Sequence, residues 1–196
     1  MTDLVGALLP LFVGAPLLLG GILFTLPRQS SLQQILGLGT LVSVLAGAVS
    51  LLVLTSDGRV FAHQISLWPE GIAIAFVADS FAALILSAAA LVAVVSFGYM
   101  IVSGESSSPS IPGLVLILIG GVSGALLTAD LFNLFVFIEV MLLPSYGLLI
   151  FLSRKGEMAG IRLYVVVNLL ASTLFLAGVG LIYAVQITVN LAALAG

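Results

Sequence analysis

Residues 128–146 read TADLFNLFVFIEVMLLPSY, an apolar stretch of helical length that carries one carboxylate, Glu139, near its middle. Asp130 lies close to its start, and Pro144 follows the glutamate by a little more than one helical turn. A charged side chain at the centre of a bilayer costs about 2.5–3.5 kcal/mol on insertion scales. A glutamate kept at that depth therefore needs a hydrogen-bond partner, a proton or a functional role.

The composition of the chain places this stretch in a membrane. Of the 196 residues, 62% are hydrophobic and 7% are charged, whereas ordinary globular proteins carry about 25% charged residues. The small net charge of -3 argues against a nucleic-acid partner. Because there is no cysteine, the sequence offers neither a disulfide framework nor a thiolate metal site. We expect no metal and no cofactor.

Six apolar runs reach the length of about 20 residues that a membrane-spanning helix needs. They do not alternate as the strands of a membrane barrel would, so an all-α integral membrane protein is predicted. The fourth and fifth runs meet at Ala129-Asp130 and must form a tight helical hairpin. The predicted spans are Leu4–Leu26, Leu32–Leu54, Ser80–Val102, Ile111–Thr128, Leu131–Leu152 and Ile161–Val185.

A short β-hairpin on the membrane surface is predicted between the second and third spans, at about residues 57–79. Large side chains recur there at Ile72, Ile74 and Phe76 with alanine between them, which is the period-2 pattern of a strand. The chain is expected to fold back around Pro69-Glu70-Gly71.

Basic residues predict the orientation of the spans, because cytoplasmic loops carry an excess of lysine and arginine. Arg28 follows the first span, and Arg154, Lys155 and Arg162 flank the loop after the fifth, so these loops lie on one side. Only Arg59 lies on the opposite side. We therefore predict a multi-pass protein of the cell membrane, surrounded by lipid, with both termini facing outward.

Glu139 is the predicted proton carrier. It lies nine residues after Asp130, which is about 13 Å along a helix that rises 1.5 Å per residue, and so near the membrane midplane. Apolar surroundings favour the neutral carboxyl group, whereas a nearby cation favours the charged form. A carboxylate that depends on a movable partner can load and release protons. The alternative is a static, neutral acid that is hydrogen-bonded to a neighbouring helix.

Pro144 and Tyr146 are expected to support Glu139 from the same helix. Proline has no N–H, so the carbonyl of Val140 loses its helical hydrogen bond. The helix should kink or admit a water molecule there. Tyr146 lies on the helical face of Glu139.

Three further polar residues are candidate supporting groups. In the sixth span, Asn168 and Ser172 are four residues apart and share a face. They are candidates to bind Glu139 or a water molecule, and the alternative is a hydrogen bond that only joins two helices. Asp130 is predicted to be the N-cap of its helix, with an acid at the outer mouth of the proton path as the alternative.

The run Thr128–Leu149 resembles the fifth helix of the D-type subunit of the Mrp-type multisubunit cation/proton antiporters. These proteins are related to the antiporter-like subunits of respiratory complex I and membrane-bound hydrogenases. The similarity extends to Leu67–Ile72, Val77–Ser80, Arg162–Leu170 and Ile187–Ala195, so it covers essentially the whole chain.

This resemblance implies a transporter subunit and not an enzyme. It implies that Glu139 is the essential intramembrane acid of a proton path, with other antiporter subunits as partners and protons and Na⁺ as the transported ions. It also implies that residues 1–110 form an N-terminal three-helix region and that residues 111–196 begin the first antiporter-like repeat, with its helices four to six.

This chain is shorter than the members of the family that it resembles. The resemblance implies a partner lysine on a broken seventh helix, and no span of this chain holds a lysine or arginine away from its ends. Three interpretations therefore stay open. The chain is part of an Mrp-type antiporter subunit, or a proton-translocating subunit of a complex I-type or hydrogenase-type redox complex, or a truncated, non-conducting remnant. For the redox-complex interpretation, the sequence shows no recognisable quinone, flavin or cluster site.

Overall fold

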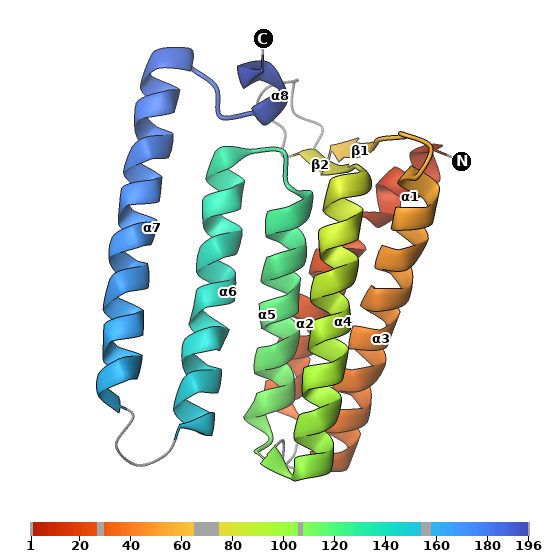
Figure 1. Cartoon of the computed structure of the whole chain (residues 1–196), viewed down its shortest axis with the longest axis vertical. Coiled ribbons are helices and arrows are strands. Elements are labelled where there is room, and N and C mark those ends of the chain that lie inside the picture. The colour runs from red at the N-terminus through yellow and green to blue at the C-terminus, as the bar shows by residue number, and fades with distance from the viewer. Residues whose placement is uncertain (1, 27–29, 65–74, 106–107, 154–157, 196) are drawn as a thin grey trace.

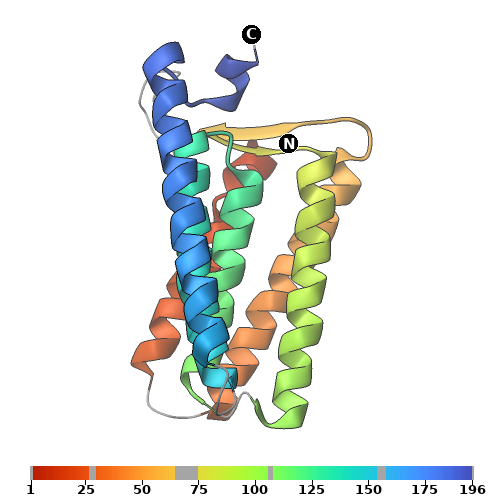
Figure 2. The same cartoon turned by 60° about the vertical axis from the view of Figure 1, so that its left-hand side comes forward.

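Six long apolar spans lie side by side in one bundle (Figure 1, Figure 2). The computed structural model describes residues 2–26, 30–64, 75–105, 108–153 and 158–195. Within these ranges, six helical spans are long and apolar enough to cross a membrane, which confirms the predicted fold class. The elements are α1 (Thr2–Leu8), α2 (Leu11–Thr25), α3 (Ser30–Thr55), β1 (Phe61–Gln64), β2 (Ala75–Ala78), α4 (Ser80–Ser103), α5 (Ser110–Leu127), α6 (Leu131–Leu152), α7 (Met158–Gln186) and α8 (Leu191–Leu194).

The first span differs from its prediction because it contains a break. It consists of α1 and α2, which are separated by a turn at Leu9-Pro10. Proline has no N–H to donate to the preceding turn, so α1 ends before Pro10. The carbonyl of Pro10 then accepts the N–H of Gly14 at 2.8 Å as α2 begins.

The predicted hairpin is present as the antiparallel pair β1 and β2. His63 lies opposite Phe76 in its register, and it is partly exposed. Phe61 and Phe76 are buried against the bundle. The predicted reversal at Pro69-Glu70-Gly71 and the large side chains of Ile72 and Ile74 lie outside the described residues.

Helix α5 is the centre of the bundle. More than half of its residues are buried, and each of the other spans is buried by a third or less. It packs closely on α2, where a β-carbon on Gly20 would lie 3.0 Å from the carbonyl oxygen of Gly113. The same distance separates a β-carbon on Gly113 from the carbonyl oxygen of Gly20. Small residues permit this approach of two backbones.

An adjacent face of α5 packs equally closely on α6. A β-carbon on Gly121 would lie 2.9 Å from the backbone nitrogen and from the β-carbon of Met141. The next turn of α5 presents Gly124 to the ring of Phe137 and leaves no space for a side chain. The tight α5–α6 hairpin predicted from the sequence therefore rests on glycines.

Backbone hydrogen bonds from two other parts of the chain hold the link between α5 and α6. On one side, the Ala129 N–H donates to the Ala75 carbonyl of β2 (3.0 Å). On the other side, the Leu131 N–H donates to the Val189 carbonyl (2.9 Å), and the Leu191 N–H donates to the Ala129 carbonyl (2.9 Å). These bonds satisfy backbone groups that no helix satisfies, and they fix the point at which α6 begins.

We call the segments 75–76, 128–131 and 188–191 the surface junction. It lies at one end of the bundle, with the strands and α8 (Figure 1). The chain enters the third segment through Ile187, whose backbone is left-handed (φ 57°). That conformation costs a non-glycine residue of order 1–3 kcal/mol, so the surrounding contacts must hold it in place.

We expect Gly121→Ala to lower the free energy of unfolding by about 1–3 kcal/mol, because the added methyl group would push the α5 and α6 backbones apart. Denaturation of the detergent-solubilised protein by SDS would measure the change. Gly39→Ala is the matched control, because a β-carbon at that helical position would meet no other described part of the chain within 4 Å, its own helix backbone aside. Equal stability of the two variants would contradict close α5–α6 packing.

Candidate functional site

Glu139 lies near the middle of α6, on the side turned away from α5. Phe137 and Met141 face α5, and helical geometry puts Glu139 on the opposite side. Tyr146 lies seven residues later on the Glu139 side, and its ring meets that of Tyr164 in α7 edge to face (centroids 5.7 Å apart). The face of α6 that carries Glu139 is therefore the one that approaches α7.

One oxygen of the Glu139 carboxyl group, Oε1, is buried without a hydrogen-bond partner. Among the described residues, Gln33 Oε1 is the other buried side-chain atom without a partner. The Gln33 side chain has a packing role, because its Nε2 donates to the Leu23 carbonyl (3.0 Å) near the end of α2. A buried, unpaired polar atom costs about 1–3 kcal/mol, and no comparable packing role accounts for it in Glu139.

Helix α7 turns the two predicted polar residues of the sixth span toward α6. Most of α7 is exposed, and its buried residues Ile161, Ser172 and Val179 follow helical spacing along one face. Asn168 is half-buried one turn from Ser172. Asn168 Nδ2 donates to the Tyr164 carbonyl (2.9 Å) and Ser172 Oγ to the Leu169 carbonyl (3.2 Å), so neither of these recorded bonds goes to Glu139.

Asp130 caps the N-terminus of α6. Its Oδ1 accepts the backbone N–H of Asn133 at 2.8 Å. The Asn133 side chain in turn donates to the hydroxyl of Thr128 at 3.0 Å. These bonds give the first turn of α6 the hydrogen-bond acceptor that a helix start requires.

Pro144 lies within α6, which continues through it without interruption. The proline leaves the Val140 carbonyl, one residue after Glu139, without its helical donor. The next residue, Ser145, turns its hydroxyl back to the Leu142 carbonyl (2.7 Å). That the Val140 carbonyl binds a water molecule beside Glu139 stays a prediction.

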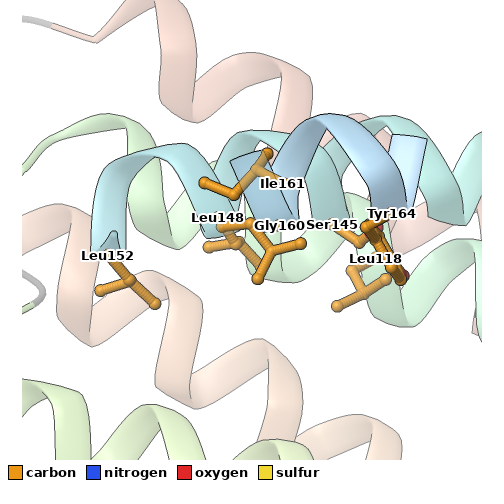
Figure 3. A pocket seen from close by; sticks show the side chains of 8 residues that line it. Leu118, Ser145, Leu148, Leu152, Gly160, Ile161 and Tyr164 are labelled. Atoms are coloured by element: carbon orange, nitrogen blue, oxygen red, sulfur yellow. The ribbon is translucent and has the colours of Figure 1, made fainter. Parts of the chain in front are cut away.

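Two cavities lie on either side of the Glu139 level, each between α6 and α7. The first, the Asp130 cavity, has a volume of about 590 Å³ and includes Asp130, Asn133, Leu176, Val179, Tyr183 and Thr188 in its lining. The second, the Tyr164 cavity, has a volume of about 570 Å³ and is shown in Figure 3. Its lining includes Leu118, Ser145, Leu148, Leu152, Gly160, Ile161 and Tyr164.

Sequence reasoning missed Tyr164, Tyr183 and Thr188 as residues near the site. Tyr164 lies one turn from Asn168 on α7, so helical spacing could have indicated it. Thr188 and Asp130 line the same cavity because of the surface junction, and no local sequence pattern reveals that arrangement. Within the described ranges, no group of three acidic or histidine side chains could hold a metal ion.

Curated relatives of the chain are antiporter subunits, although no protein-family model matches it. The D-type subunit of a Na(+)/H(+) antiporter from Alkalihalophilus pseudofirmus is 35% identical over 190 residues, which cover 96% of this chain and 38% of the relative. The D-type subunit of a probable K(+)/H(+) antiporter from Rhizobium meliloti is 35% identical over 201 residues, which cover 100% of this chain and 37% of the relative. The chain thus spans less than two fifths of the length of these relatives.

The solved structures that contain a chain with the same fold include two membrane complexes. One is the Mrp complex from a Dietzia species, with a TM-score of 0.90 and 45% identity over 94% of this chain and 35% of that chain. The other is a membrane-bound sulfane sulfur reductase, an archaeal respiratory membrane complex. Its TM-score is 0.81, with 27% identity over 97% of this chain and 39% of that chain.

We expect Asp130→Ala to lower the free energy of unfolding by about 0.5–2 kcal/mol, the usual cost of losing an N-cap. Asp130→Asn should stay close to the original protein, because asparagine caps helices equally well. Glu105→Ala, in the exposed segment after α4, is the control for loss of a surface carboxylate. SDS denaturation of the three variants measures the change in the free energy of unfolding. If Asp130→Asn lost as much stability as Asp130→Ala, the charge of Asp130 would matter beyond capping.

Proposed function

We propose that this chain, which is 35% identical over 96% of its length to a D-type antiporter subunit, is the N-terminal portion of an Mrp-type D subunit and takes part in proton translocation through Glu139. It would act as a transporter subunit and not as an enzyme. Residues 1–110 would form the N-terminal three-helix region, and residues 111–196 would begin the first antiporter-like repeat. Other subunits of the complex would be its partners.

The observation that carries this proposal is the buried, unpaired Oε1 of Glu139. Glu139 lies on α6 between the levels of two cavities, whose nearest α6 residues are Asn133 and Ser145. A permanently charged carboxylate in that position would need a partner for the oxygen, and a static acid would be expected to have one. A carboxyl group that repeatedly gains and loses a proton needs an unsaturated site that a proton or a water molecule can occupy. The geometry therefore supports a proton carrier over a static acid.

A cationic partner for Glu139 would come from outside the described spans. The two basic residues that the structure describes, Arg59 and Arg162, lie at the ends of spans. A cation that approaches Glu139 from another segment or subunit would favour release of its proton, and withdrawal of the cation would favour uptake. Movement of such a partner would couple the proton to a second ion, for which the names of the relatives suggest Na⁺ or K⁺.

We also propose a cell-membrane location with both termini on the outer side. The charge bias of the loops supports this orientation. The structure is consistent with it, because α1 and α8 lie at the same end of the bundle (Figure 1). The surface junction and the Asp130 cavity would then face outward, and the Tyr164 cavity would lie toward the cytoplasm.

A second candidate function is that of a proton-moving subunit in a redox-driven membrane complex. The match to the archaeal respiratory complex favours it, but its 27% identity is well below the 45% identity to the Mrp complex. Purification of the chain with its partners from native membranes would decide between them. We expect further antiporter subunits, and co-purified iron–sulfur proteins would favour the redox complex instead.

We expect Glu139→Gln to reduce cation-driven proton movement in membrane vesicles by at least about 100-fold, the low end of a proton-transfer contribution. Glutamine keeps the size of the side chain but carries no exchangeable carboxyl proton. A pH-sensitive dye would report the movement, and immunoblots would show whether the complex still assembles.

Glu105→Gln is the matched control, because it makes the same change at an exposed residue after α4. It should retain full transport. Normal transport by Glu139→Gln would contradict the proposed role and leave a non-conducting, structural part of the complex as the better explanation.

A further inference from the structure

The two cavities beside Glu139 differ in their capacity to hold water. The Asp130 cavity is lined by a carboxylate, an amide and two hydroxyl groups, from Asp130, Asn133, Tyr183 and Thr188. A cavity holds water when it is roomy and offers each molecule two or more polar partners. The Asp130 cavity meets both conditions.

The Tyr164 cavity meets only the first of these conditions. Its polar side chains are Ser145 and Tyr164, and the rest of its lining is leucine, isoleucine and glycine. The Ser145 hydroxyl already donates to the Leu142 carbonyl. A largely apolar lining offers water few polar partners. The ring contact between Tyr146 and Tyr164 also lies between this cavity and the Glu139 level.

A mostly apolar step, with Ser172 as its polar side chain on α7, separates the Asp130 cavity from Glu139. On α6, Glu139 follows Asn133 by six residues, which is about 9 Å along the helix. On α7, the cavity reaches Val179 and Leu176, and Ser172 lies about one turn deeper on the buried face. Because α6 and α7 run antiparallel, this turn of α7 approaches the level of Glu139.

Ser172 is suited to hold a water molecule at this step. Its side chain is 7% exposed, and its hydroxyl donates to the Leu169 carbonyl of its own helix. A hydroxyl oxygen has two lone pairs, so it can still accept a hydrogen bond from water. Glu139 Oε1 is the unpaired polar atom that such a water could reach.

From this geometry we infer that protons reach Glu139 through the Asp130 cavity, and that Ser172 positions the last water molecule of the path. The Tyr164 cavity stays dry and does not conduct. This inference rests on the proposed function of Glu139 and adds the route to it. Access is from the end of the bundle that carries the surface junction.

Accessibility of single cysteines tests the route without depending on transport. The sequence contains no cysteine, so labelling is measured on this chain after it is separated by electrophoresis from the other subunits of the assembled complex. Val179→Cys reports on the Asp130 cavity and Ser145→Cys on the Tyr164 cavity. The two positions are at similar distances from the Glu139 level, because Val179 lies seven residues from Ser172 on α7 and Ser145 lies six residues from Glu139 on α6. Leu174→Cys, on the exposed face of α7, measures background modification.

We expect a membrane-impermeant thiol reagent to modify Val179→Cys at least about tenfold faster than Ser145→Cys, because the reaction needs a hydrated thiolate. The reagent is applied to each side of the membrane in turn, and only the side of the surface junction should give rapid modification of Val179→Cys. Equal rates at the two positions, or faster modification of Ser145→Cys, would overturn the inference.

The role of Ser172 is tested by two substitutions in the same complex. Ser172→Ala should slow proton movement by about tenfold, the loss of one well-placed hydrogen bond at about 1.4 kcal/mol per factor of ten. Ser172→Thr keeps the hydroxyl and should restore most of the rate, which a purely structural contact would not require. Equal rates for the alanine and threonine variants would overturn this role.

These outcomes separate the route from the proposed function. If Glu139→Gln abolishes transport but Val179→Cys is unreactive, the route is wrong and the proton carrier stands. If Glu139→Gln transports normally, the proposed function is wrong and the proton route falls with it, whatever the cysteine reactivity shows.

Discussion

The contact between the α5 and α6 backbones is the constraint on which the site depends. Glycines at 121 and 124 bring the two helices so close that Met141 and Phe137 must face α5. Once that face of α6 is fixed, helical geometry assigns the opposite face to Glu139. The glutamate is thus directed toward α7 by residues that never touch it. A hydrophobic bundle held by larger side chains would not define the rotation of α6 so strictly, because lipid competes equally well for an apolar surface.

Helix α7 is less constrained than α5, because it has no comparable close contact with α6. Helix α5 is enclosed by its neighbours, whereas α7 packs on α6 and exposes most of its surface. Its position is set at one end by the surface junction and along its length by a sparse face of buried residues. The cavities lie in the space that this loose packing leaves between α6 and α7. The tightly packed helices α5 and α6 therefore position Glu139, and the loosely packed α7 leaves the space from which Glu139 is reached.

The sequence predicts the spans well because each is a long apolar run with a clear polar boundary. Leu131–Leu152 agrees at both ends, since Asp130 caps one end of the helix and Ser153 follows the other. The break at Leu9-Pro10 was missed because hydropathy does not change there. The position of Glu139 near mid-membrane follows from counting residues, but the burial of its Oε1 does not. That burial depends on the rotation of α6 and on the path of α7, which are long-range properties. The cavities were unpredictable for the same reason.

The surface junction has a consequence for how this region can vary. Its inter-segment bonds join backbone groups, so the side chains at Ala129, Leu131 and Val189 contribute nothing to them directly. Many substitutions at these positions would leave the bonds intact. One inserted or deleted residue in 128–131 would instead shift the pairing on both sides at once and turn α6 by about 100° relative to α5. Natural variation at this link should therefore appear as replaced residues and not as gaps, and the number of residues between the two helices is its most restricted property.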